Sequence, residues 1–385
     1  MSRLDDARAK PSRLVVGLMS GTSADGIDAA LVRVEASGAA TRVETLAFLT
    51  RPYPPAVRAT VLELRERTAT DVCRWNVELG ESFAAAALEV IAKAGLRPED
   101  VDLVGSHGQT IVHLPRTSGR GAATLQIGEP CVIAERTGLP VVADFRMRDV
   151  AAGGDGAPLV PWVDWLTMRP AAGQRLVQNL GGVGNVTLVT QEPEGVVAFD
   201  TGPGNGPLDA ATALTSGGRL AHDEGGRLAA QGRIDENEVR ALLGHPFLER
   251  SPPKSASRET FGEPLVAALA RRRPDLSSAD LLATLTEFVA RSIVHAYERH
   301  LPPDRAPVDV VVSGGGVHNA TLLARLRRLL DPLPVRSSAD LGVDPDAREA
   351  VAFAVLANET LFGNAGNLPR VTGARWPVVL GKLVP

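Results

Sequence analysis

Short apolar runs separated by glycine-containing turns open the sequence. The first run, residues 14–19, is continuous and typical of a buried strand. Three strands joined by short turns make a meander, and two stretches rich in leucine and alanine after it predict helices. The expected elements are strands over 14–19, 27–34, 44–50 and 101–105, and helices over 54–67 and 72–94.

The same order of elements recurs in the second half of the chain. It predicts strands over 175–180, 186–189, 195–199 and 308–312, and helices over 207–215, 236–243, 262–272 and 278–300. The two halves share an order of elements but have low sequence identity to each other. At roughly 150 residues per domain the length also indicates two domains. We expect domains over 12–170 with 350–385 and over 171–349, with a last helix, 346–362, returning to the first domain.

Composition narrows the class of protein. The apolar share of 44% and charged share of 22% are ordinary for a soluble enzyme. A net charge of −4 offers no electrostatic basis for binding nucleic acid or a membrane surface. The apolar run over 14–19 is too short for a signal peptide or a membrane span, so we expect a cytoplasmic protein with a disordered start of about a dozen residues. Cys73 and Cys131 are expected to be buried thiols, without a disulfide or zinc.

Four glycine-rich corners follow four of the expected strands. They lie at residues 20–26, 181–185, 202–206 and 314–316. Glycine permits a close backbone approach, and successive backbone N–H groups can cradle phosphate oxygens. Each corner alone is also compatible with a simple turn, but the recurrence of such corners at strand ends favours a phosphate-binding role. No corner precedes a Lys-Ser or Lys-Thr pair, which excludes a P-loop, and the corner at 181–185 leads into a strand, which disfavours a dinucleotide fold.

Several carboxylates lie next to these corners. Asp25 and Asp28 lie in and just after the first corner, and Asp200 ends a strand directly before the third. Asp200 could act as a general base or hold Mg²⁺ through water, and capping of its own turn is equally compatible with the pattern. His107 and His113 have no third partner at metal-binding spacing, so no metal site is predicted there.

Ten blocks of sequence, spread from about residue 14 to 375, carry a resemblance. They are GLMSGTS (17–23) with Asp25, Gly26 and Asp28; GSHGQT (105–110); QIG (126–128); ADFR (143–146) with Arg148 and Asp149; GAPLVP (156–161); NLGG (179–182) with Asn185; FD (199–200) with 202–205; PKS (253–255); GGG (314–316) with Asn319; and Glu349 with 352–354. In this order the blocks resemble the motifs of the anhydro-N-acetylmuramic acid kinases.

The resemblance implies a fold and an activity. The fold is α/β, with two duplicated ribonuclease-H-like (actin-like ATPase) domains, each a five-stranded mixed sheet with helices, around a central cleft that holds ATP. Kinases of this family act on 1,6-anhydro-N-acetylmuramic acid, ATP and water, and give N-acetylmuramic acid 6-phosphate and ADP in peptidoglycan (cell-wall) recycling. The resemblance also implies a homodimer whose ligand partner is this small sugar.

The resemblance assigns roles to residues by position. Asp200 is implied as the base that activates water for attack at C1 of the sugar. Mg²⁺ would bridge phosphate oxygens, held mainly through water. Arg148 would pair with the lactyl carboxylate, although a surface ion pair is its alternative. The implied nucleotide-binding residues are Gly21, Thr22, Ser23, Asp25, Gly26, Asp28, Gly181, Gly182, Asn185, Gly314, Gly315, Gly316 and Asn319, and the implied sugar-binding residues are His107, Arg148, Gly202, Asn205 and Glu349.

Some positions depart from the usual family pattern. Asp155 replaces a glutamine, residues 162–164 read Trp-Val-Asp in place of Ala-Phe-His, and Ser313 stands where cysteine is frequent. The first two changes bear on the sugar, which leaves open a kinase for another 1,6-anhydro sugar such as levoglucosan. A non-catalytic nucleotide-binding regulator is a third reading, which the presence of Asp200 disfavours.

Overall fold

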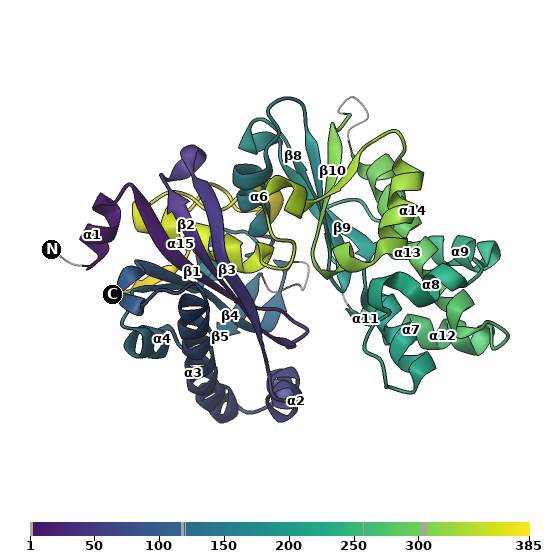
Figure 1. Ribbon diagram of the computed structural model, residues 1–385, viewed down its shortest axis with the longest axis horizontal. Coiled ribbons are helices and arrows are strands. Elements are labelled where there is room, and N and C mark those ends of the chain that lie inside the picture. Colours follow the sequence, from purple (N-terminus) through teal and green to yellow (C-terminus); the bar gives the residue numbers. More distant parts are fainter. Residues whose placement is uncertain (1–2, 117–118, 120, 257, 302–305) are drawn as a thin grey trace. The chain divides into compact units, whose positions relative to one another are not determined.

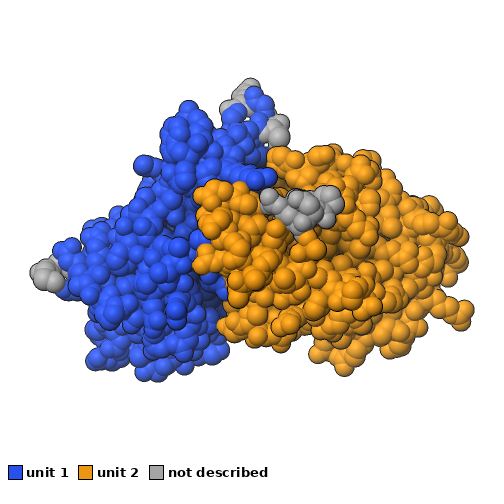
Figure 2. Space-filling view, turned by 90° about the horizontal axis from the view of Figure 1, so that it is seen from above, with its two compact units in different colours: residues 1–167, 347–385 blue, residues 168–346 orange. Residues whose placement is uncertain are grey.

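The chain folds into two compact units, which Figure 2 distinguishes by colour. The computed structural model describes residues 3–116, 119, 121–256, 258–301 and 306–385. Unit 1 comprises residues 1–167 and 347–385, and unit 2 comprises residues 168–346. The sequence places domain boundaries after residues 170 and 349, and the assignment of both domains as ATPase-type remains a prediction.

Unit 1 is built on a seven-stranded sheet in the order β12-β6-β4-β1-β2-β3, with β5 paired to β4. Strands β1 to β3 form an antiparallel meander, and β4 and β6 run parallel to β1 on its other side. The strands are β1 (Ser12–Ser20), β2 (Gly26–Glu35), β3 (Arg42–Pro52), β4 (Leu103–Leu114), β5 (Ala123–Ile127), β6 (Val141–Ala143) and β12 (Lys382–Val384).

Helices cover both faces of this sheet (Figure 1). Leu79 and Phe83 of α3 join the core cluster that contains Val16 and Leu18 of β1. Gly17 lies between these two positions and so faces the opposite side, where α15 packs. The helices of unit 1 are α1 (Arg3–Ala9), α2 (Pro55–Glu63), α3 (Ala69–Lys93), α4 (Pro130–Thr137), α5 (Phe145–Ala151), α6 (Val160–Met168), α15 (Arg348–Phe362) and α16 (Pro369–Thr372).

Unit 2 repeats the topology of unit 1. Its sheet has the order β11-β10-β7-β8-β9, with β7 to β9 antiparallel, β10 parallel to β7 and β11 parallel to β10. The order β6-β4-β1-β2-β3 in unit 1 has the same directions, so the predicted duplicated α/β fold with mixed sheets is confirmed. The five strands predicted for each domain are correct for unit 2, whereas unit 1 adds β5 and β12. The strands are β7 (Arg175–Leu180), β8 (Val183–Val189), β9 (Val197–Pro203), β10 (Asp309–Ser313) and β11 (Val335–Ser337).

The core of unit 2 forms around α13, a helix of 23 residues that is buried along most of its length. Its Leu285, Phe288 and Ile293 share one apolar cluster with Leu176 of β7 and Phe199 of β9. The helices are α7 (Gly206–Ser216), α8 (Arg227–Gln231), α9 (Glu236–Leu243), α10 (Pro246–Glu249), α11 (Arg258–Phe261), α12 (Glu263–Arg272), α13 (Ser278–His300) and α14 (Ala320–Leu330). Short 3₁₀ helices complete both units: η1 (Gly38–Ala40), η2 (Leu64–Glu66), η3 (Pro98–Asp100), η5 (Pro193–Gly195), η6 (Glu224–Gly226), η7 (Gly315–His318) and η8 (Ser338–Leu341).

The structure differs from the sequence-based expectations at several places. Strand β4 continues past Gly105 because the β4–β5 hairpin pairs its polar second half, and β9 continues past Asp200 because it pairs with β8.

Residues 3–9 are helical rather than disordered, and the Arg3 guanidinium donates to the carbonyls of Pro98, Val101 and Gly138. Both cysteines are exposed, not buried. Within the described residues, no helix is long and apolar enough to cross a membrane.

The close seat of α15 on the sheet can be tested at Gly105. A Cβ atom there would overlap Phe353 O, a backbone atom that cannot move without shifting the helix. We expect Gly105→Ala to lower the free energy of unfolding by about 1–3 kcal/mol, the usual cost of overpacking a core, measured as a drop in Tm. Gly244→Ala is the matched control, since Gly244 has φ −73° and its Cβ would lie 3.3 Å from the nearest atom, Ala241 O. Equal Tm values for the two variants would contradict the close packing.

Candidate active site

The two corners that follow β7 and β9 interlock in unit 2. Asn205 N–H donates to Gly181 O over 2.7 Å, and Gly206 N–H donates to Gly182 O over 3.0 Å. A Cβ atom on Gly204 would overlap Gly181 O, so only glycine fits at position 204. The two predicted corners are therefore hydrogen-bonded to each other, backbone against backbone.

The corner after β10 joins the same edge of the sheet. Gly314 has φ +80°, a conformation that favours glycine, and a Cβ atom on Gly316 would overlap the side chain of Leu180. The amide of Asn205 donates to Leu180 O over 3.1 Å, and a Cβ atom on Gly316 would also lie 3.0 Å from Asn205 Oδ1, so this corner packs against residues of the other two. Asn319 caps α14, since its side-chain oxygen accepts the N–H of Leu322 over 2.9 Å. Three of the four predicted corners thus lie together at the carboxyl ends of β7, β9 and β10.

The first corner belongs to unit 1 and is held by β4. Gly21 O accepts hydrogen bonds from Ala24 N–H over 3.0 Å and from the Gln109 amide over 3.1 Å. The Ser20 hydroxyl lies 2.7 Å from both Gly26 O and Gln109 Oε1. Gln109 therefore braces the whole turn, a role that the sequence did not assign because its contacts cross between two strands.

Two carboxylates flank this first corner. Asp25 is exposed and pairs with Arg58 over 2.9 Å, and Asp28 on β2 accepts a hydrogen bond from the Thr50 hydroxyl over 2.6 Å. Thr22 is also exposed. Over the described part of the chain, no group of three or more His, Cys, Asp or Glu side chains is arranged to hold a metal ion.

Asp200 is a partly buried carboxylate within β9, opposite Asn185 of β8. Its Oδ2 accepts the N–H of Ala256 over 2.7 Å, so its partner belongs to a distant loop rather than to its own turn. Burial raises the pKa of Asp200 to about 6, although the Ala256 hydrogen bond and the charge of Lys254 act in the opposite direction. A carboxylate that titrates close to neutral pH is suited to accept a proton and release it again.

A second polar cluster forms in unit 1 around Arg146, which the sequence analysis left without a role. Arg146 Nε donates to His107 Nε2 over 2.9 Å, and His107 Nδ1 lies 2.8 Å from Gly108 O. Both ring nitrogens are thus in use, and burial with the nearby Arg146 charge holds the pKa of His107 well below its usual value. Burial lowers the pKa of Arg146 to about 10, opposed by the charges of Glu349 and Asp149.

Arg146 thus interacts with two of the predicted sugar-binding residues: it donates a hydrogen bond to His107, and the charge of Glu349 acts on it. Arg148 lies two residues further along α5 and is exposed. Two residues of a helix turn through about 200°, so Arg146 and Arg148 point in different directions. Arg146, which is partly buried, and not the exposed Arg148, is therefore the cation of this cluster. Its place in the ADFR block was the only signal for it in the sequence.

Three of the positions that depart from the family pattern, Asp155, Trp162 and Asp164, lie in unit 1. Asp155 accepts from the Arg116 side chain over 3.0 Å and from its backbone N–H over 2.8 Å. Asp164 forms a buried ion pair with Arg348, in which Arg348 Nε donates over 2.9 Å. Trp162 is buried on α6. Asp155, Trp162 and Asp164 therefore serve packing and ion pairing within unit 1.

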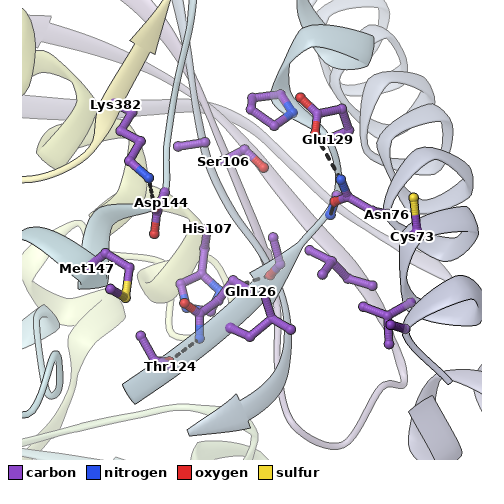
Figure 3. A pocket seen from close by; sticks show the side chains of 18 residues that line it. Cys73, Asn76, Ser106, His107, Thr124, Gln126, Glu129, Asp144, Met147 and Lys382 are labelled. Atoms are coloured by element: carbon purple, nitrogen blue, oxygen red, sulfur yellow. Dashed lines mark hydrogen bonds and ion pairs between the residues drawn. The ribbon is translucent and has the colours of Figure 1, made fainter. Parts of the chain in front are cut away.

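A pocket of about 470 Å³ opens beside β4 and β5 in the same unit (Figure 3). An ion pair between Asp144 and Lys382 lies among the residues that line it, as Figure 3 shows. The Ser106 hydroxyl and Gln126 Oε1 are buried without a hydrogen-bond partner among the described residues. Such atoms are normally paired with water or a ligand, so this pocket offers polar groups to a small molecule.

The mixed sheets of the two units share one strand order, so the chain has a duplicated α/β fold. A family model described as anhydro-N-acetylmuramic acid kinase matches residues 13–385, and the chain belongs to this kinase family. It is 46% identical to the anhydro-N-acetylmuramic acid kinase of Caldanaerobacter subterraneus subsp. tengcongensis over 394 aligned residues, with 100% of both chains covered. It is 43% identical to that of Bacillus thuringiensis subsp. konkukian, with 96% of this chain and 98% of the relative covered. A solved ROK family glucokinase from Streptomyces griseus, in complex with glucose and AMPPNP, gives a TM-score of 0.39 at 16% identity, with 90% of this chain and 99% of that chain covered.

The interlocked corners of unit 2 make a prediction about nucleotide binding. Gly204→Ala should force the corner after β9 away from Gly181 O and misplace the backbone that we expect to receive a phosphate. We expect affinity for an ATP analogue, measured by calorimetry, to fall by about tenfold or more, equivalent to about 1.4 kcal/mol. Gly244→Ala in the same unit is the control and should bind as the parent does. Unchanged affinity in the Gly204 variant would show that the corners do not serve the nucleotide.

Proposed function

We propose that this chain uses ATP and water to convert 1,6-anhydro-N-acetylmuramic acid into N-acetylmuramic acid 6-phosphate and ADP, with Asp200 as the general base. The observation that carries the proposal is the partly buried Asp200 carboxylate, with a pKa of about 6, in the strand that leads into the interlocked glycine corners. Membership of the anhydro-N-acetylmuramic acid kinase family supports the substrate.

The chemistry of the anhydro sugar explains why a base of this kind is needed. O6 of the sugar is bound to C1 and carries no proton, so nothing has to be removed from O6. Water attacks C1 and gives a proton to Asp200, while the C1–O6 bond breaks. O6 then takes the γ-phosphoryl group of ATP, and ADP leaves with the bridging oxygen. A base with a pKa near the working pH holds the proton only briefly, which suits repeated turnover.

We assign the nucleotide to the glycine corners. The backbone around Gly21, Thr22, Ser23 and Gly26 and around Gly181 and Gly182 would receive the phosphates, and Gly314 to Gly316 the adenosine, with Asn185 and Asn319 nearby. Mg²⁺ bound with ATP would neutralise charge on the phosphate oxygens. Asp25 and Asp28 supply hard oxygen ligands but already accept hydrogen bonds from Arg58 and Thr50, which fits an ion held mainly through water.

We assign the sugar to both units. Gly202 and Asn205 lie at the end of β9 and after it, close in sequence to Asp200. In unit 1 the proposal adds Arg146 to His107, Arg148 and Glu349, because Arg146 is the cation that lies among the predicted residues. A guanidinium can hold the lactyl carboxylate of muramic acid through two hydrogen bonds.

We also propose that the protein works in the cytoplasm, in peptidoglycan recycling, and that its active form is a homodimer. Light scattering on the purified protein tests the oligomeric state, and a monomeric mass under assay conditions would remove the homodimer from the proposal.

The role of Asp200 predicts a pH dependence. The base must be ionised to accept a proton, so kcat/KM should be constant above pH 7 and fall as the pH drops through about 6, the pKa of Asp200. Asp200→Asn should lower kcat by about 10²–10⁴, the usual contribution of a general base, and leave ATP affinity within about twofold. An active asparagine variant, or a rate that does not fall in acid, would exclude Asp200 as the base.

The substrate is tested by ADP release with Mg-ATP and each of three sugars. We expect turnover with 1,6-anhydro-N-acetylmuramic acid and, at equal concentration, at least about tenfold lower kcat/KM with levoglucosan, because a lost charged contact costs about 1.5–3 kcal/mol. N-acetylmuramic acid lacks the anhydro bridge and should not react. Preference for levoglucosan would keep the mechanism and change the substrate, and ADP release that is independent of sugar would contradict both.

A further inference from the structure

Two hydrogen bonds tie Asp200 to a loop segment, residues 254–256, that follows α10. Asp200 N–H donates to Lys254 O over 3.2 Å, and Ala256 N–H donates to Asp200 Oδ2 over 2.7 Å. The segment thus holds both the main chain and the carboxylate of Asp200. The direction of the carboxylate depends on where this segment lies, so whatever anchors the segment also positions Asp200.

The anchor is the side chain of Lys254, which is only 6% exposed. Its ammonium donates to Leu248 O over 3.3 Å and lies 3.2 Å from His300 Nε2. The rings of Phe247 and Phe199 approach the ammonium to 5.0 and 5.9 Å, a geometry in which ring faces attract a cation. Because burying an ammonium costs free energy unless it is paired, these contacts indicate a site built to hold a lysine.

The charged groups around Lys254 come from three elements. Asp200 lies on β9, Glu249 lies on α10, and Arg299 and His300 are the last two residues of α13. Burial lowers the pKa of Lys254 to about 8, with Asp200 and Glu249 acting against this shift and Arg299 reinforcing it. Burial and the Lys254 charge lower the pKa of His300, so the imidazole stays neutral and accepts a hydrogen bond from the ammonium. Lys254 is therefore still largely charged at neutral pH.

We propose that Lys254 is a positioning residue for Asp200: its buried ammonium anchors the segment that holds the carboxylate and stabilises that carboxylate in its ionised form. The inference rests on the proposed function, in which Asp200 accepts the proton of the attacking water. It explains how a carboxylate that burial would otherwise keep protonated is available as a base at neutral pH.

The test is the pH profile of kcat/KM for Lys254→Met, which keeps the length of the side chain and removes the charge. Loss of an opposite charge should move the acid limb of the profile up by about one pH unit, so the variant should lose about fivefold at pH 6, nearly tenfold at pH 5, and recover almost fully by pH 9. Lys254→Arg keeps the charge and should keep the limb at its original pH. If the methionine variant does not fold by circular dichroism, Lys254→Gln, which keeps a donor for Leu248 O, carries the same test.

A purely structural lysine would behave differently. Loss of kcat by the same factor at every pH, with the acid limb unmoved, would overturn the proposal. Arg299→Met is the matched control, since Arg299 is an exposed cation near Lys254, and water screens its charge, so its loss should leave the limb in place. Inactivity of the unmodified protein with the anhydro sugar would count against the proposed function. If the unmodified protein is active, Asp200→Asn is inactive and the acid limb of the pH profile does not move in Lys254→Met, the result counts against this inference alone.

Discussion

Unit 2 depends on the close approach of backbone to backbone at one edge of its sheet. The carbonyls of Gly181 and Gly182 accept N–H groups from the corner after β9, and no side chain fits at Gly204 where the two meet. Asn205 donates its amide to Leu180 O, and Gly316 of the corner after β10 packs against both of these residues. Three turns from different parts of unit 2 thus pack together at one edge of the sheet, next to the strand that carries Asp200.

Unit 1 uses close approach in another form. Gly17 and Gly105 leave room for α15 to lie directly on β1 and β4, closer than any side chain would permit. The seat of α15 places Glu349, in its first turn, near Arg146. The cluster of Arg146, His107 and Glu349 thus joins residues from strand β4, helix α5 and a helix near the end of the chain.

Burial of charge is what makes both clusters chemically useful. Removing Asp200 from water raises its pKa to about 6, and the lysine beneath it opposes this effect, so the carboxylate titrates near neutral pH. In unit 1, burial beside Arg146 keeps His107 neutral, with each ring nitrogen already engaged. The two clusters therefore suit different tasks: Asp200 can exchange protons, whereas the arginine of unit 1 can hold an anionic group.

Local pattern alone determined a large part of this protein. The strand over residues 175–180 and the helices over 236–243 and 278–300 begin and end where their sequences predict, because apolar spacing and capping residues act over a few neighbours. The duplicated strand order and the four glycine corners were also readable, since each depends on turns close in sequence. Only the tertiary structure decided that β4 continues through His107 and that Gln109 braces the first corner. It also decided that Arg146, and not Arg148, is the less exposed arginine, and that the segment with Lys254 is hydrogen-bonded to Asp200. Each of these depends on contacts between residues far apart in the chain, and burial, which sets their pairing and their pKa values, exists only once the chain has folded.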